Sequence, residues 1–296
     1  MANLKDLKNR IASVKSTRKI TKAMQMVAAA KLRRAQEAAE NARPYARKFD
    51  EVVGQLAKSV GDSDTAPPLL RGTGQEQTCL LVVMTSEKGL CGGFNTNIAK
   101  KAIARIRALQ DEGKTVKIIT VGKKGRAAMR RTYGDMMIDH VDMSEVKRVG
   151  YGDAQEIARN VLDRFDAGEF DTAYIYYGEF ENAMTQIPTE QQIIPAQFDA
   201  EDDEDGAGAN TVYEYEPSEE AILRDLLPKG VATQIFAALL ENSASEQGAR
   251  MTAMDNATRN ADDMVEDLNR QYNRTRQSVI TNELIEIISG AEALEG

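Results

Sequence analysis

The sequence predicts an α/β middle domain inserted between long N- and C-terminal helices, which are expected to form an antiparallel left-handed coiled coil. Three observations support this fold class. An apolar heptad seam lies near the N-terminus, and a second one lies near the C-terminus. Between them is an α/β-patterned stretch of about 130 residues.

The N-terminal helix is predicted from apolar residues that recur in alternating steps of three and four. These residues are Leu4, Leu7, Ile11, Val14, Leu32, Ala35, Ala39, Ala42, Ala46, Phe49, Val53, Leu56 and Val60. Only Arg18, Thr21, Gln25 and the small Ala28 weaken this seam. Pro44 is expected to kink or loosen the helix locally, because proline removes a backbone hydrogen bond.

The middle domain is predicted from short apolar runs that alternate with helical periodicity. A buried strand is expected at 78–85, followed by a glycine-containing loop and a helix that ends near Leu109. Further strands are expected at 116–121 and 173–180, helices at 123–131 and 153–165, and extended chain at 184–195. Strand, loop and helix in succession indicate an α/β unit.

The C-terminal seam consists of Met254, Ala257, Ala261, Val265, Leu268, Tyr272, Thr275 and Val279. We expect Pro228 and Gly230 to interrupt the helical pattern. One long helix should then run from about 231 to 289 and end at Gly290.

These elements divide the chain into four expected segments. They are an N-terminal coiled-coil helix (1–60), a linker (61–77), an α/β globular foot domain with an acidic loop at 199–209 (78–209), and a C-terminal region that carries the long helix (210–296).

Composition excludes several classes of protein. Residues 1–50 hold 13 Lys and Arg against 4 Asp and Glu, but the sequence pI is near 5.0, so a dedicated nucleic-acid-binding protein is not favoured. The apolar run Leu80–Met84 is far shorter than the roughly 20 residues of a membrane span. Cys79 and Cys91 lack the spacing of a metal site and are too few for a disulfide framework. We expect no metal and no cofactor.

The loop after the first strand is the best candidate for a ligand cradle, but it fails the specific tests. It has no Gly-Lys-Ser/Thr ending and does not match the dinucleotide glycine spacing, so a tight turn is the favoured interpretation. His140 is the sole histidine, and the acidic clusters have the spacing of a solvated helix face. No residue pattern argues for catalysis by this chain.

Five segments resemble one known family, the gamma subunits of F-type ATP synthases. They are Arg10–Thr17 (RIASVKST), Ile20–Ala28 (ITKAMQMVA), Lys88–Asn95 (KGLCGGFN), Ser245–Met254 (SEQGARMTAM) and Ile280–Ala291 (ITNELIEIISGA). The segments occur in the family's order and cover both ends and the middle of the chain. Glu87 stands where the family commonly has Asp.

The resemblance implies a non-catalytic central rotor shaft of the CF(1)-type motor, in which proton-driven rotation of the c-ring makes three beta sites cycle through conformations that synthesise ATP. ATP hydrolysis would drive the shaft backwards. The implied partners are three alpha and three beta subunits per copy, the epsilon subunit and the c-ring. The implied location is peripheral, on the cytoplasmic face of the bacterial inner membrane.

The resemblance also implies which residues contact the alpha and beta subunits. Arg276 and Gln277 resemble a polar pair that engages beta, with Thr281 close by, and arginine suits this role because its planar fork can hold carboxylates. The implied apolar tip consists of Leu284, Ile285, Ile287 and Ile288, and Met24 resembles a position that faces the lever region of beta.

Two other readings compete with a rotor. A structural coiled-coil scaffold would leave the middle domain unexplained. A small-molecule enzyme that uses the glycine loop would lack catalytic groups.

Overall fold

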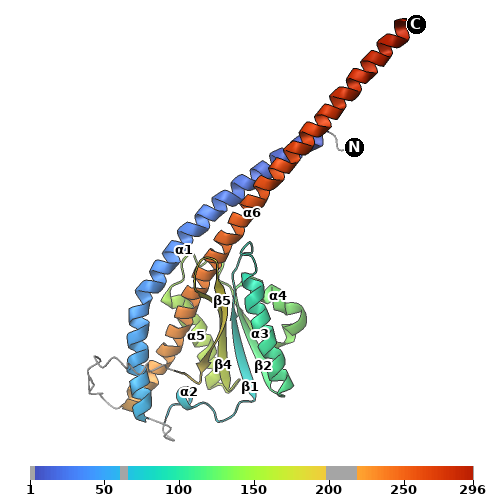
Figure 1. The fold of residues 1–296 in the computed structure, drawn as a ribbon. Helices are drawn as coiled ribbons and strands as arrows, with labels where there is room; N and C mark the ends of the chain where they lie inside the picture. Colours follow the sequence, from blue (N-terminus) through green and yellow to red (C-terminus); the bar gives the residue numbers. More distant parts are fainter. Residues whose placement is uncertain (1–3, 61–65, 198–218, 296) are drawn as a thin grey trace. The chain divides into compact units, whose positions relative to one another are not determined.

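The structure, a computed structural model, describes residues 4–60, 66–197 and 219–295 (Figure 1). The acidic loop expected at 199–209 lies outside the described residues. The chain divides into two units, one made of residues 1–28 and 251–296 and the other of residues 29–250. Two long helices contribute residues to both units.

The elements follow in the order α1 (Leu4–Val60), α2 (Pro68–Arg71), β1 (Thr78–Met84), α3 (Phe94–Asp111), β2 (Thr115–Val121), α4 (Lys123–Tyr133), the 3-10 turn η1 (Gly134–Met136), β3 (Met137–Val141), α5 (Tyr151–Asp166), β4 (Thr172–Phe180), β5 (Gln186–Ile194) and α6 (Glu219–Glu295). The prediction of long terminal helices around a central α/β domain is therefore confirmed.

The five strands form one sheet in the order β3-β2-β1-β4-β5. The first four strands are parallel, and β5 pairs antiparallel with β4. Strand β1 lies at the centre, and all its residues after Thr78 are buried. A strand that is buried on both faces is typical of a parallel sheet covered by helices, which explains why its sequence is continuously apolar.

Alternate side chains of β1 supply two cores. Leu80, Val82 and Met84 pack on one side with apolar residues of α5 and α6. Leu81 and Val83 pack on the other side with residues of α3 and α4. The part of α6 within residues 219–250 is thus one of the helices that cover the sheet, a role that sequence periodicity did not predict.

The expected break at Pro228 and Gly230 and the expected end at Gly290 are wrong, because α6 runs without interruption from Glu219 to Glu295. Leu223, Leu227 and Val231 are each 0% exposed and lie at spacings of four residues on both sides of Pro228. Two of them pack in a core with Val53 and Leu56 of α1. This packing offsets the roughly 3 kcal/mol that proline costs inside a helix.

Three short elements were not predicted from the sequence: α2, η1 and β3. All five residues of β3 are only half-buried, and the strand lies at the edge of the sheet. In the described ranges, no helix contains a stretch long enough and apolar enough to cross a membrane.

Candidate functional surface

The residues expected to contact partners all lie in the unit made of residues 1–28 and 251–296. Seven are exposed on the last part of α6: Arg276, Gln277, Thr281, Leu284, Ile285, Ile287 and Ile288. The four apolar side chains among them are 53–68% exposed. Met24 lies on α1 and is half-buried. The seven residues lie within one continuously exposed segment, residues 276–288, which we call the tip segment.

The pairing of α1 with α6 explains why the tip segment is exposed. Three cross-helix hydrogen bonds are Arg18 Nη1 to Asp262 Oδ1 (2.7 Å), Thr21 Oγ1 with Thr258 Oγ1 (2.8 Å) and Gln25 Nε2 to Asp255 Oδ1 (2.8 Å). The residue numbers of each pair add up to 279 or 280, so the helices are antiparallel in a constant register. Leu4, the first described residue of α1, therefore lies level with about residue 275.

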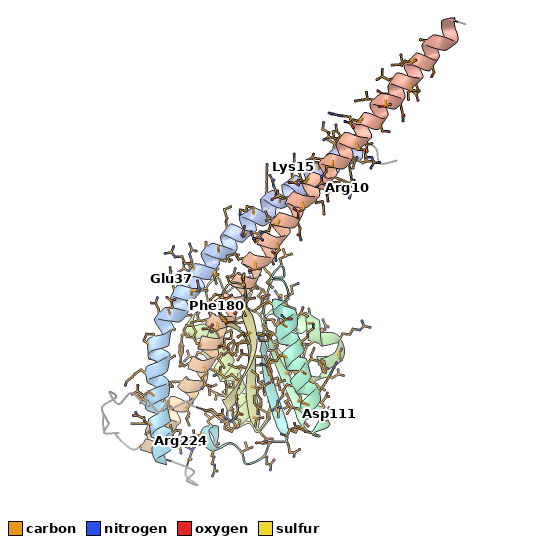
Figure 2. All side chains as sticks on the ribbon, in the orientation of Figure 1. Arg10, Lys15, Glu37, Asp111, Phe180 and Arg224 are labelled. Atoms are coloured by element: carbon orange, nitrogen blue, oxygen red, sulfur yellow. The ribbon has the colours of Figure 1, made fainter. Side chains whose placement is uncertain are left out.

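Residues 276–295 consequently continue past the described start of α1 as a single helix, which Figure 1 shows at the C-terminal end of α6. At ~1.5 Å per residue, this segment is roughly 30 Å long. Figure 2 shows the side chains of residues 276–291 projecting from the helix.

Apolar side chains form one broad face of this single helix. Ile280, Leu284, Ile287 and Ile288 recur at i, i+4, i+7 and i+8 and therefore share this face, and Ile285 lies at its edge. Ile280 is 48% exposed, similar to the tip residues. Exposed apolar surface of this kind marks an interaction site, and an apolar surface of a partner would fit it without requiring directional bonds.

The polar part of the tip segment begins at Arg276 and Gln277, whose side chains are exposed. The hydroxyl of Thr281 donates to the carbonyl oxygen of Gln277 at 2.9 Å, so its donor is satisfied within its own helix. Arg276 is exposed, so its guanidinium can bind a carboxylate of a partner in a bidentate manner.

Met24 has exposed apolar neighbours on α1. Ile20, Met26 and Val27 are 57%, 60% and 56% exposed. Lys22 is exposed, and its Nζ donates to Gln25 Oε1 at 3.0 Å. Ile20 and Val27, at spacings of four and three residues, share the face of Met24, whereas Met26 and Lys22 lie on the opposite side of the helix. The face formed by Ile20, Met24 and Val27 is a second candidate contact surface.

The polar pairs between α1 and α6 were missed by sequence reasoning, which treated Arg18, Thr21 and Gln25 as weak points of the seam. In the structure each of them bonds a residue of α6. The signal was present in the sequence, because Thr258, Asp255 and Asp262 lie level with these residues once the helices are aligned antiparallel.

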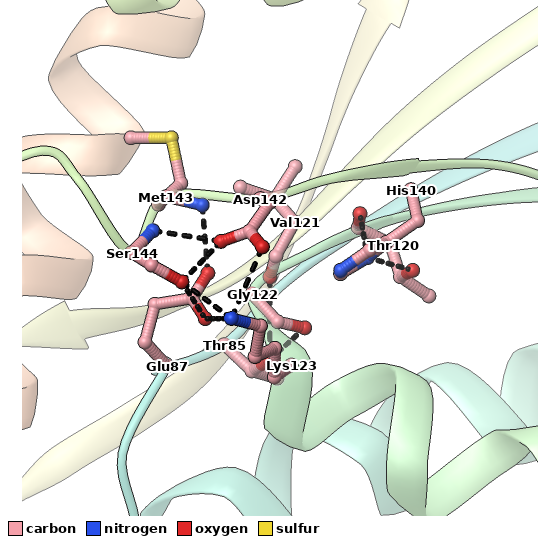
Figure 3. Close-up of polar contacts among 10 residues, drawn as sticks. All are labelled: Thr85, Glu87, Thr120, Val121, Gly122, Lys123, His140, Asp142, Met143 and Ser144. Carbon is pink, nitrogen blue, oxygen red and sulfur yellow. Dashed lines mark hydrogen bonds and ion pairs between the residues drawn. The ribbon is translucent and has the colours of Figure 1, made fainter.

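The carboxyl end of the parallel sheet, where α/β enzymes commonly bind ligands, is occupied by side chains that bond one another (Figure 3). Lys123 Nζ lies 3.0 Å from Asp142 Oδ2 and 3.9 Å from Glu87 Oε2. Glu87 Oε1 accepts the backbone N–H of Met143 at 2.8 Å. Hydrogen bonds from the hydroxyl and N–H of Ser144, followed by Lys123, hold the pKa of Asp142 well below its usual range.

These bonds tie the loop after β1 to the segment after β3. The polar groups of Glu87, Lys123 and Asp142 at this edge of the sheet are thus directed at each other. Among the described residues there is no group of three or more His, Cys, Asp or Glu that could hold a metal ion.

The glycine-containing loop is also filled by its own side chains. The hydroxyl of Ser86 donates to the carbonyl oxygen of Lys88 at 2.7 Å, and Asn95 Oδ1 accepts the backbone N–H of Ser86 at 2.9 Å. Leu90 and Gly92 have positive φ angles of 64° and 58°. The loop is therefore a tight turn held by internal hydrogen bonds, in agreement with the favoured interpretation.

Comparisons with known proteins give a consistent result. A family model described as ATP synthase matches residues 3–294. The ATP synthase gamma chain of Ruegeria sp. (strain TM1040) is 71% identical over 294 residues, which cover 99% of this chain and 100% of that protein. The gamma chain of Paracoccus denitrificans (strain Pd 1222) is 64% identical over the same shares of the two chains.

Two solved structures are also similar. A chain from the central stalk and c-ring of the Tetrahymena thermophila mitochondrial ATP synthase is 26% identical with a TM-score of 0.59, and the match covers 80% of this chain and 99% of that one. A rotor chain of the Euglena gracilis mitochondrial ATP synthase has a TM-score of 0.65 at 22% identity, with coverage of 94% and 98%, and supports the fold alone.

Proposed function

Because this chain belongs to the ATP synthase gamma-chain family, we propose that its tip segment turns inside a ring of three alpha and three beta subunits. The chain acts as the central rotor shaft, which couples rotation of the c-ring to the conformational cycle of the catalytic sites. It is a non-catalytic subunit, and catalysis takes place on the beta subunits. A coiled-coil scaffold without rotation is not favoured.

The observation that carries the proposal is the single exposed helix after residue 275, with a broad face of exposed apolar residues. A monomeric protein rarely leaves such a surface in water. A ring of subunits would surround the helix, and non-directional apolar contact would let it turn with a low barrier.

Polar residues would give the shaft its directional contacts. Arg276 and Gln277 would engage carboxylates or carbonyls of a beta subunit, while Thr281 lies one turn further along the same helix. Met24, with Ile20 and Val27 exposed on the same face of α1, would face the lever region of beta. The different contact surfaces on the two helices would make the shaft asymmetric.

The remaining partners follow from the same family membership. We expect one copy of the chain per three alpha and three beta subunits, with the foot domain against the epsilon subunit and the c-ring. The complex would then place this chain at the cytoplasmic face of the bacterial inner membrane.

The first experiment is to tag the chain, isolate its native complex and determine the subunit stoichiometry by mass. One copy with three alpha and three beta subunits, and ATPase activity in the assembly but none in the isolated chain, is the expected result. A homo-oligomer without these partners would overturn the proposal and support a scaffold.

The second experiment tests the contact residues. The double substitution Arg276→Ala with Gln277→Ala should lower the ATPase rate of the assembled complex by roughly tenfold, because charge-assisted hydrogen bonds to the partner are lost. Arg274→Ala on the same exposed helix is the matched control. Equal effects of the two variants would refute the assigned roles.

A further inference from the structure

The unit made of residues 1–28 and 251–296 contains a cluster of polar contacts in the middle of its helix pair. We call this cluster the polar clamp, and its members are Arg18, Thr21 and Gln25 of α1 with Asp262, Thr258 and Asp255 of α6. The three cross-helix bonds, 2.7–2.8 Å long, are spaced about one helical turn apart on each helix.

The central pair of the polar clamp is the most enclosed. Thr21 is 8% exposed, and Thr258 is half-buried. The hydroxyl of Thr21 also lies 3.0 Å from the carbonyl oxygen of Arg18, and that of Thr258 lies 2.8 Å from the carbonyl oxygen of Met254. Whichever hydroxyl donates across the interface, the other can donate to its own helix. Neither group is therefore left unsatisfied.

One outer pair of the polar clamp is an ion pair, and the other contains an amide that is hydrogen-bonded at both ends. Arg18 and Asp262 form an ion pair whose side chains are 41% and 49% exposed. Gln25 donates its amide N–H to Asp255 and accepts a hydrogen bond from Lys22, so both ends of the amide are fixed. The second carboxylate oxygen of Asp255 pairs with Arg259 on its own helix.

The apolar contacts beside the polar clamp are made partly by small residues. Ala28 is 1% exposed and Ala261 is 6% exposed. Small apolar surfaces allow helices to approach closely, but their contact is non-directional and opposes sliding or rotation only weakly. Polar pairs at seam positions, by contrast, specify the register of a coiled coil.

We infer that the polar clamp is a positioning device that prevents α6 from sliding or turning against α1, and so keeps the tip segment at a fixed angle and height relative to Met24. A relative movement of the helices would separate the buried hydroxyl of Thr21 and the half-buried hydroxyl of Thr258, which costs more than displacing methyl groups. This role rests on the proposed function, since a shaft under torque must transmit rotation between contact surfaces on different helices.

The test measures a distance between α1 and α6 directly, in the full chain. Spin labels are placed at Lys15→Cys and Glu283→Cys, which are exposed positions on α1 and α6 (Lys15 is labelled in Figure 2). Glu283 lies about 18 residues beyond the level of Lys15, which is roughly 27 Å along the axis, so relative sliding changes the distance almost linearly. Native Cys79 and Cys91 are buried, and the chain without introduced cysteines is the labelling control.

The informative variant is Thr21→Val with Thr258→Val, which removes both hydroxyls and conserves volume. The inter-label distance distribution should widen by roughly twofold, because directional bonds are replaced by non-directional contact. Thr21→Ser with Thr258→Ser keeps both hydroxyls and should retain the narrow distribution. Thr17→Val, which removes an exposed hydroxyl bonded only within α1, is the matched control.

The same variants are then assembled into the ATP synthase complex, and ATP-driven proton pumping is compared with ATP hydrolysis. The ratio of pumping to hydrolysis should fall severalfold in the valine variant and recover in the serine variant. An unchanged distance distribution would overturn the clamp, and so would a widened distribution with an unchanged ratio. A complex that lacks alpha and beta subunits would instead overturn the proposed function, and the distance measurement would still stand.

Discussion

Arg250 and Glu246, one turn apart on α6, form an ion pair in which Nη2 lies 2.6 Å from Oε1. The same nitrogen of Arg250 lies 3.3 Å from the carbonyl oxygens of Lys88 and Gly89. The pair therefore connects α6 to the turn after β1, within the unit made of residues 29–250. An arginine held by a carboxylate can donate to both loop carbonyls, in addition to the bond that the Lys88 carbonyl accepts from the hydroxyl of Ser86.

The pH dependence of stability should report on Glu246. Burial raises the pKa of this carboxyl above its ordinary value of 4.5, and Arg250 and Lys31 only partly oppose the increase. The folded chain therefore binds a proton more readily than the unfolded chain. The contribution of Glu246 to stability is greatest at low pH and declines as pH rises from 4.5 through the raised pKa.

We predict that Glu246→Gln makes the free energy of unfolding less dependent on pH in that window, because glutamine stays neutral and still accepts from Arg250. Denaturant unfolding at several pH values between 4 and 7 measures this slope. Glu266→Gln, an exposed position on α6, should leave the slope unchanged. An identical slope in wild type and Glu246→Gln would contradict the prediction.

Gly122 is predicted to be intolerant of any side chain. Its φ angle is +90°, and an added Cβ would lie 2.2 Å from the carbonyl oxygen of Thr85. Gly113 has a similar φ of +76°, but an added Cβ there would meet no atom within 4 Å. Substitution of Gly113 therefore tests the cost of backbone strain alone, and substitution of Gly122 adds the cost of a steric clash.

Gly113→Ala should cost about 1 kcal/mol in unfolding free energy, which is the strain of a left-handed conformation. Gly122→Ala should cost at least ~3 kcal/mol, because the backbone of the β1 and β2 ends must also shift. Denaturant unfolding of the two variants measures the difference. Similar losses in both would show that the clash is relieved without cost.

Elements with a clear local residue pattern could be predicted from the sequence, whereas elements that depend on pairing with distant residues could not. Strand β1 was predicted from its residues alone, because burial on both faces requires a continuous apolar run. Strand β3 was missed because it contains Asp139 and His140 and is half-buried throughout. Its place in the sheet depends on pairing with β2, which is not encoded locally.

The path of α6 was missed for a similar reason. Proline and glycine are read as helix breakers from local propensity, yet Pro228 and Gly230 lie where Leu223, Leu227 and Val231 are fully buried. Tertiary packing overrides propensity there. For the candidate surface, the resemblance supplied the residues of the tip segment, while their exposure followed only from the register of α1 against α6.

Asp171 is predicted to stabilise the start of the sheet. Burial favours its neutral form, but hydrogen bonds from the N–H of Thr78, the hydroxyl of Thr73 and the N–H of Gln77 outweigh burial and lower its pKa. Its two oxygens accept all three bonds at 2.9 Å. Stability from this group is present above pH 3.8, the ordinary value, and is lost as pH falls through the lowered pKa.

Asp171→Asn should lower the unfolding free energy at pH 7 by about 1–3 kcal/mol, because a neutral amide oxygen accepts the two backbone N–H groups more weakly than a carboxylate and the NH2 group replaces the oxygen that accepts the hydroxyl of Thr73. Its effect should shrink on acidification. Asp166→Asn, an exposed position at the end of α5, is the control. A pH-independent loss in Asp171→Asn would show that ionisation of this carboxyl is not the cause.

The ion pair of Arg18 with Asp262 offers a prediction about the unit made of residues 1–28 and 251–296 alone. Arg18→Asp would place two carboxylates where 2.7 Å now separates opposite charges. Both side chains are more than 40% exposed, so solvent screens the interaction and the local cost should be only about 0.5–1 kcal/mol.

Adding Asp262→Arg to Arg18→Asp should recover most of that loss, since the reversed pair can form the same bond. Hydrogen exchange of the amides in residues 10–28 measures local stability without requiring global unfolding. Lys19→Asp, at the next position on α1, makes the same charge change away from Asp262. If the double variant exchanges as fast as Arg18→Asp, the two residues are not energetically coupled. This outer pair of the polar clamp would then affect the geometry of the helices and not their stability.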